Sequence, residues 1–157
     1  MNVDFRIRYV SDSRDLKLSR NFLHRHELGY PGYDEWIDCV CIPEIENGYK
    51  HGVIALHESK VVGNLIWQPH KELPRTTEIK NLRIHPEVRE RGLAYFLMKQ
   101  CEFESKANSD MLIADFPSDQ NGIKIFLMKY GFSVLYQAHL YNDKRLETVM
   151  MKKLHPL

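Results

Sequence analysis

The sequence predicts an α+β protein with about six to seven strands, and two kinds of pattern lead to that prediction. Short runs that alternate in apolarity, or that are continuously apolar, recur along the chain, as strands do. Two later segments instead carry apolar residues every three to four positions, the period of a helix lying on a sheet. The expected order is strand, helices, three strands, helix, strand, helix and two strands.

Composition describes a folding chain with balanced charge. The 157 residues are 43% apolar and include 22 basic and 21 acidic side chains, for a net charge of +1. That length suits one domain, residues 1–157, and that balance argues against a dedicated nucleic-acid binder. No apolar run reaches the length of a signal-peptide core or a membrane span, so we expect no membrane partner.

Three cysteines, Cys39, Cys41 and Cys101, indicate a reducing compartment, because the first two are too close for an ordinary disulfide. We therefore expect a cytoplasmic protein with buried free thiols. A C-x-C pair can also be half of a metal site. No second Cys or His pair stands at ligand spacing, so no metal is predicted.

The first third of the chain is predicted to hold a strand, a helix and a long loop. Residues 5–9 alternate in the period of a half-buried strand. Residues 11–13 can cap a helix that runs toward Leu28, and Gly29 is placed to end it. Residues 29–49 contain prolines at two separated positions, so we expect a short helix within a long loop.

The acidic and aromatic side chains of this loop allow two interpretations. They could form an anionic, aromatic lip for a cationic amine, or a solvated acidic loop over aromatic packing, which is the commoner arrangement. The residues concerned are Asp34, Glu35, Asp38, Glu44 and Glu46 with Tyr30, Tyr33 and Trp36. His24 and His26 lie on the preceding helix and are expected to be solvated.

The remaining strands are indicated by apolar runs bounded by turn residues. A hairpin is expected around Ser59-Lys60, with Gly63 as a possible bulge. Single strands are expected at 76–84 and 111–116, and a closing hairpin is expected around Asn142-Asp143.

Two apolar stripes locate the later helices and their ends. The first stripe consists of Ala94, Leu97, Met98 and Cys101, and the second of Ile123, Phe126, Leu127 and Tyr130. Both have the spacing of a helix face turned toward a sheet. Gly131 suits the left-handed position after the second helix, and the first helix begins near Gly92.

The segment NLRIHPEVRERGLAYFL, residues 81–97, places a charged loop with one glycine between a strand and a helix. The first N–H groups of a helix have no internal partner and carry partial positive charge. Gly92 lets backbone approach a ligand, Ala94 keeps that approach open, and Arg89 and Arg91 add full charges. The loop therefore fits phosphate or pyrophosphate, although a solvated capping loop would have a similar sequence.

The motif R-x-x-G-x-A formed by Arg89, Gly92 and Ala94 resembles the acyl-CoA-binding signature of the GNAT superfamily of N-acyltransferases. Residues 121–132, NGIKIFLMKYGF, resemble a later helix of that family. The resemblance covers nearly the whole chain. It implies a three-layer fold with helices on both faces of a mixed sheet, in which strands four and five splay apart and the pantetheine arm of the cofactor fills the gap.

The resemblance also implies a set of cofactor contacts. Backbone groups of Leu82, Arg83 and Ile84 would pair with pantetheine, and one N–H group would polarise the thioester carbonyl. Asn121 would reach the cofactor from the later helix. The pyrophosphate would lie on the loop and first helical turn, which comprise Arg89, Glu90, Arg91, Gly92, Leu93, Ala94 and Tyr95. Tyr95 replaces a small hydroxyl residue frequent in the family.

Attack by an amine needs a base, because an ammonium has no lone pair. Glu78 occupies the place of a strand glutamate that serves as base in some family members, and it could equally be an ordinary exposed carboxylate. Asp115 is the second candidate. Leu127 stands where many members carry a tyrosine that protonates the leaving thiolate. Water, Tyr136 or Tyr141 could take that role.

The expected activity is transfer of an acetyl group from acetyl-CoA to a primary amine of a small molecule, peptide or protein. One alternative is an acyltransferase acting on RNA-borne amines such as aminoacyl-tRNA, and another is a non-catalytic acyl-CoA binder. The sequence identifies neither the acceptor nor the oligomeric state, and a dimer is compatible with it.

Overall fold

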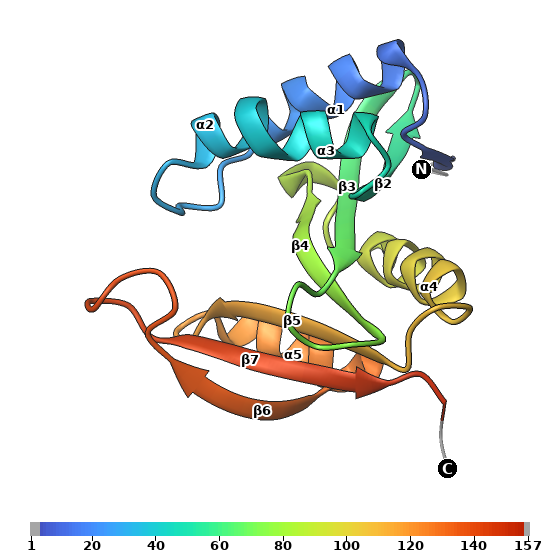
Figure 1. The fold of residues 1–157 in the computed structure, drawn as a ribbon. Coiled ribbons are helices and arrows are strands. Elements are labelled where there is room, and N and C mark those ends of the chain that lie inside the picture. The colour runs from blue at the N-terminus through green and yellow to red at the C-terminus, as the bar shows by residue number, and fades with distance from the viewer. Residues whose placement is uncertain (1–3, 156–157) are drawn as a thin grey trace. The chain divides into compact units, whose positions relative to one another are not determined.

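The computed structural model describes residues 4–155, and its strands form a mixed sheet in the order β1-β2-β3-β4-β5-β7-β6 (Figure 1). This confirms the predicted α+β class and the number of strands. The strands are β1 (Arg6–Tyr9), β2 (His51–His57), β3 (Lys60–Pro69), β4 (Thr76–Ile84), β5 (Met111–Pro117), β6 (Ser133–Ala138) and β7 (Glu147–Lys153).

The chain divides into two compact units, each described by itself below. The first unit contains described residues 4–68 and 80–101, and the second contains 69–79 and 102–155, so β4 and α4 contribute to both. The helices are α1 (Ser13–Arg25), α2 (Tyr33–Trp36), the π-helix η1 (Ile37–Cys41), α3 (Ile42–Glu46), the 3₁₀ turn η2 (Pro86–Val88), α4 (Leu93–Ser105) and α5 (Asn121–Tyr130). The single-domain assignment stays a prediction.

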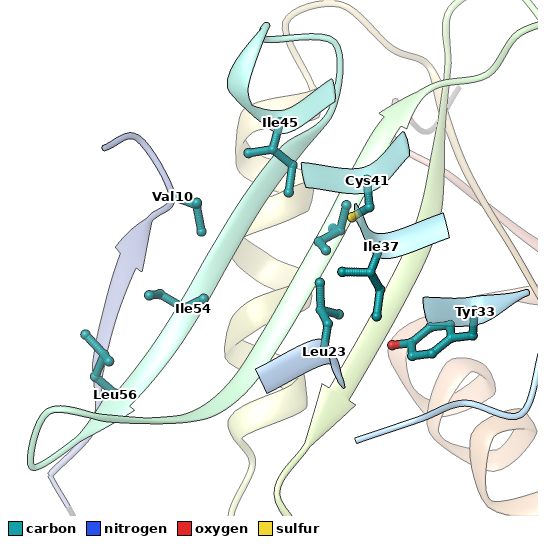
Figure 2. Close-up of a cluster of buried hydrophobic side chains, with 9 residues drawn as sticks. Val10, Leu23, Tyr33, Ile37, Cys41, Ile45, Ile54 and Leu56 are labelled. Atoms are coloured by element: carbon teal, nitrogen blue, oxygen red, sulfur yellow. The ribbon is translucent and has the colours of Figure 1, made fainter. Parts of the chain in front are cut away.

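One continuous helical run, α2–η1–α3, occupies most of residues 29–49, for which we predicted a short helix within a long loop. Its side chains Tyr33, Ile37, Cys41 and Ile45 are all buried. They face Ile54 of β2 together with side chains from α1 in one apolar cluster (Figure 2). The prediction of a loop rested on Pro31 and Pro43. Pro31 precedes the run, and Pro43 lies inside it, at the second position of α3 directly after the π-helical turn.

The opposite face of β3 in the first unit is covered by α4 (Figure 1). A β-carbon added at Gly63 would lie 3.1 Å from Ile84, 3.3 Å from Leu93 and 3.4 Å from Leu97. The missing side chain therefore allows α4 to approach the strand. The β2–β3 register shifts beside this position, because Ala55 lies opposite Gly63 and Leu56 opposite Val61. A bulge is therefore present, and its extra residue is Val62, one position before the predicted Gly63.

Several boundaries and burials differ from the sequence prediction. Strand β1 is exposed along its whole length rather than half-buried. Helix α1 ends at Arg25, before the predicted Leu28. The first hairpin turns at Glu58-Ser59, both with positive φ, one residue before the predicted turn. The periodicity that predicts a helix or a strand says little about where the element ends, so the predicted ends are displaced by a few residues.

The second unit packs α5 beside β5, β6 and β7. Gly131, with φ of 115°, ends α5 as predicted. Leu127 and Tyr130 of the predicted stripe are buried, whereas Ile123 is exposed. The Tyr130 hydroxyl donates to Glu102 at 2.5 Å, and Lys152 forms an ion pair with the same carboxylate, so the buried charge of Glu102 is compensated.

His24 connects α1 to the following helical run through both of its ring nitrogens. Nδ1 lies 2.8 Å from Asp34 and Nε2 lies 2.9 Å from Asp38. Arg20 donates to the same Asp38 at 2.7 Å. The two carboxylates, Asp38 first, raise the pKa of His24 above its ordinary value of 6.5, so the expectation of a solvated His24 is wrong. This partnership requires a doubly protonated ring.

We expect His24→Gln to remove a pH-dependent part of the stability. The folded-state pKa is raised, so the contribution is fully present below the unfolded value of about 6.5. It is lost as pH rises through the folded-state pKa, because the neutral ring can donate to only one carboxylate. The melting temperatures of wild type and His24→Gln should therefore converge with rising pH. A difference that stays constant from pH 5 to 9 would contradict this account.

Candidate active site

The connection from β4 to α4 is a strained turn that opens a helix. After Ile84, the His85 ring accepts a hydrogen bond from the Glu87 N–H at 3.2 Å and begins η2. Glu90 and Gly92 then adopt positive φ of 64° and 76°. The Gly92 carbonyl accepts the first helical bond, from Phe96. A side chain at Gly92 would be strained whatever the space around it.

This loop exposes two basic side chains suited to an anion, with one acidic side chain between them. The side chains of Arg89, Glu90 and Arg91 are exposed, and no ion pair of residues 4–155 involves either arginine. Leu93 is buried and anchors the helix, while Ala94 is half-buried. Tyr95 is 45% exposed, and the Lys99 ammonium lies 5.5 Å from its ring centre.

Strand β4 stops pairing with β5 part-way along its length. The parallel register runs from Thr76 opposite Met111 to Ile79 opposite Ala114, and within residues 4–155 it extends no further. Residues 80–84 therefore have one edge outside that ladder. This is the splaying of strands four and five that the resemblance implied.

On its other edge, β4 follows β3 in antiparallel register. The His85 N–H donates to the Val62 carbonyl, and Gly63 faces Ile84. The N–H and C=O groups of successive residues point to the two edges of a strand in turn. Those of Arg83 therefore point toward β3. The N–H and C=O groups of Leu82 and Ile84 point to the opposite edge, which lies outside the ladder with β5. The cofactor contacts of all three residues stay a prediction.

The two candidate bases lie on one face of the sheet in the second unit. Glu78 is half-buried and opposite Ile113, and paired residues of parallel strands share a face. Asp115 follows Ile113 by two positions and therefore points to the same side. The Tyr141 hydroxyl donates to Asp115 at 2.7 Å. The structure thus brings together one candidate base and one candidate acid.

The other candidates of the second unit are placed as follows. Leu127, at the family's tyrosine position, is buried with 3% exposure and belongs to the core. Tyr136 is 48% exposed on β6. Asn121 is the exposed first residue of α5. Of the two proposed tyrosines, Tyr141 is the one that donates a hydrogen bond to a carboxylate within residues 4–155.

Two expectations about the first unit are wrong. Cys39 is exposed and not buried, whereas Cys41 and Cys101 are buried; burial raises the pKa of Cys41 to about 12. His26 is not simply solvated, because it packs 4.4 Å from the Phe22 ring and 5.1 Å from the His85 ring. Tyr33 of the proposed aromatic lip is buried and stacks on Trp36, which favours the interpretation of aromatic packing.

Comparison with known proteins assigns the family. The sequence profile of the acetyltransferase (GNAT) family matches residues 15–132. The chain belongs to the GNAT acetyltransferase family. The resemblance read from Arg89, Gly92 and Ala94 is thereby confirmed, and acyl-CoA is the class of cosubstrate that GNAT proteins bind.

Solved GNAT structures share this fold at low sequence identity. The ribosomal-protein-S18-alanine N-acetyltransferase of Escherichia coli has a TM-score of 0.78 and 12% identity, with 98% of this chain and 96% of that chain covered. A GNAT acetyltransferase of Streptococcus pneumoniae has a TM-score of 0.74 and 15% identity, with 96% and 99% covered. These similarities establish the fold alone.

A structure from Bacillus anthracis in complex with acetyl coenzyme A has a TM-score of 0.64 and 16% identity, with 71% of this chain and 66% of that chain covered. A search of curated protein sequences gave no significant match. Within residues 4–155, no helix is long and apolar enough to span a membrane. The cytoplasmic location stays a prediction.

We expect Tyr141→Phe to raise the pKa of the Asp115 carboxyl. The hydroxyl stabilises the charged carboxylate by donating to it, and phenylalanine keeps the ring while removing that donor. A carbonyl-detected NMR titration of both proteins measures the change. Tyr136→Phe, at another exposed tyrosine, is the matched control and should not change the pKa of the Asp115 carboxyl.

Proposed function

We propose that this GNAT protein transfers an acetyl group from acetyl-CoA to a primary amine of a small molecule, peptide or protein. The observation that carries the proposal is the geometry of β4. Its unpaired edge at residues 80–84 leads directly into a basic, glycine-containing helix start. Such an arrangement offers backbone hydrogen bonds to an extended amide-bearing arm and N–H groups to a pyrophosphate.

The end of β4, the basic loop and the start of α5 each have a separate role in this proposal. Leu82 and Ile84 offer backbone groups to pantetheine, and an N–H group there polarises the thioester carbonyl. Arg89 and Arg91 supply charge to the pyrophosphate, while Gly92 and Ala94 keep the backbone accessible. Asn121 contributes from α5. Tyr95, as an exposed ring, borders the phosphates.

Glu78 is the proposed base, and Asp115 is the second candidate. The acceptor must lose a proton to attack, and a carboxylate within reach takes it up. The thiolate that leaves must be protonated in turn. Because Leu127 has no proton to give, Tyr141 or water serves as acid, and the hydrogen bond from Tyr141 to Asp115 shows that the hydroxyl can be held in place.

The base assignment is tested by Glu78→Gln, which keeps size and hydrogen bonding but cannot accept a proton. Turnover should fall by roughly 10²–10⁴-fold, with acetyl-CoA affinity nearly unchanged. The rate of the variant should rise with pH as the amine deprotonates unaided. Thiol release over a pH series, with a panel of amines, measures this.

Asp115→Asn is the companion variant in the same assay. If Asp115→Asn is inactive while Glu78→Gln retains wild-type turnover, Asp115 is the base. Full activity of both variants would remove the carboxylate mechanism. Acetyl-CoA binding without thiol release for any amine would instead support a non-catalytic binder.

The cofactor assignment is tested by Gly92→Val. Acetyl-CoA should raise the melting temperature of the wild type, because a ligand that binds only the folded state stabilises it. A bulky, β-branched residue at a φ of 76° should distort the loop and weaken binding. Gly48→Val, also at a positive φ and with no atom within 4 Å of the added β-carbon, is a matched control outside the loop and should leave CoA affinity unchanged. Unchanged CoA affinity in folded Gly92→Val would refute the proposed loop contact.

A further inference from the structure

A concentration of basic side chains lies where α1 ends beside the end of β4 in the first unit. We call it the Arg83 cluster, and it consists of Arg25, His26, Arg83, His85 and Arg89. The His26 and His85 rings are 5.1 Å apart at an angle of 69°. Within residues 4–155, no hydrogen bond or ion pair joins the Arg25, Arg83 or Arg89 side chain to a carboxylate. The cluster therefore holds positive charge without an internal counterion.

Arg83 is the inner member of the cluster, and part of its guanidinium is shut away from water. Its Nε atom is buried and has no hydrogen-bond partner within the described residues. Arg83 shares a strand face with Asn81, two positions earlier, whose amide donates to the Tyr33 hydroxyl at 3.1 Å. A buried N–H donor is nearly always paired in a folded protein, so an acceptor from outside the chain is expected here.

Asn64 of β3 provides a second, independent observation. The antiparallel register that joins Val62 to His85 and Gly63 to Ile84 places Asn64 opposite Arg83, on the same face of the sheet. The Asn64 side chain is completely buried, and neither its oxygen nor its nitrogen has a partner. Two neighbouring polar side chains thus present unpaired donors toward the same side.

The surroundings favour an oxyanion as the missing partner. Desolvation, followed by the charge of Arg89, lowers the pKa of Arg83. Desolvation also lowers the pKa of His26, and the neighbouring charges that add to this effect are all basic: His85, Arg83, Arg25 and Arg89. A bound anion would stabilise the charged forms of Arg83 and His26 and so offset this desolvation. His85 accepts at Nδ1 from Glu87, so its neutral ring carries the proton on Nε2 and is a further donor.

We propose that Arg83, His26, His85 and Arg89, backed by Asn64, form a site for an oxyanion, either a carboxylate or a phosphate group. The identity of its source rests on the proposed function. A phosphate would come from the CoA cosubstrate, and a carboxylate would come from the acceptor, which would then be an amine that also carries an acid group. The side chain of Arg83 has this role, and its backbone belongs to the β3–β4 ladder.

Inorganic phosphate is the first probe, with chloride at matched ionic strength as reference. Histidine ring NMR signals report on the site without any need for activity. Phosphate should shift the His26 and His85 signals and raise the pKa of His26, because an anion favours the charged ring. Phosphate affinity should therefore increase as pH falls through the His26 titration. Equal shifts at all histidines, or none at His26, would overturn the proposal.

Two arginine variants separate a specific site from general charge. Arg83→Gln should weaken phosphate binding about tenfold or more, the loss expected for a hydrogen bond to a charged group. Arg14→Gln removes the same charge from the exposed start of α1 and should leave the affinity unchanged. Equal affinity in both variants would show an adventitious ion only. If Arg83→Gln fails to fold, the effect of phosphate on the His26 pKa in the wild type still tests whether the site exists.

Asn64→Leu distinguishes a ligand-binding role from a structural one. Leucine has a similar size and removes two unpaired buried polar atoms, so the melting temperature without anion should rise. The same change should weaken phosphate binding. A variant that is stabilised but binds phosphate as tightly as the wild type would remove Asn64 from the site.

The source of the oxyanion follows from matched ligands. If it is the 3′-phosphate of the cosubstrate, Arg83→Gln weakens CoA but not dephospho-CoA. If it belongs to the acceptor, Arg83→Gln raises KM for an amine with a free carboxylate but not for its amide, with KM for acetyl-CoA unchanged. Either result supports the site, and equal effects on every ligand overturn it. Absence of acetyl transfer would refute the proposed function alone, because the phosphate titration does not depend on it.

Discussion

The alternation of backbone hydrogen bonds along β4 is the constraint on which the candidate site depends. A strand directs its N–H and C=O groups to its two edges in turn, and β3 satisfies one edge of β4 through the bond between His85 and Val62. Parallel pairing with β5 satisfies the other edge only as far as Ile79. Within residues 4–155 the ladder with β5 extends no further, so the last stretch of β4 keeps one edge for the extended ligand that we propose as a substitute strand.

The same strand separates two kinds of chemistry by side-chain parity. Ile84 points toward α4 and packs beside Gly63, where apolar contacts fix the helix whose first turn follows the basic loop. Asn81 and Arg83 point to the other face, toward Tyr33 and the end of α1. One strand thereby positions the loop with its backbone and apolar side chains, and presents polar groups on its opposite side.

Sequence patterns predicted the elements that carry the site better than those that surround it. The residues of β4 were located correctly because nine consecutive positions, residues 76–84, read as a strand before a charged loop. The Arg89–Ala94 motif was recognised because a helix start needs particular residues at particular places. The hydrogen bond from Tyr141 to Asp115 joins residues 26 positions apart, through a loop that has no period of its own. The partners of His24 and His26 likewise depend on tertiary packing, which local propensity does not predict.

The π-helix η1 lets a strict spacing of four residues remain on one side of a helix. Successive residues four apart advance about 40° around an α-helix of 3.6 residues per turn, so a stripe of Tyr33, Ile37, Cys41 and Ile45 would wind off the core. The wider turn of η1, in which the Ile42 N–H bonds the Ile37 carbonyl, rotates the stripe back. Residue count within this turn, more than residue type, therefore decides which side chains reach the sheet. A single-residue deletion there would preserve helicity and still redirect Ile45.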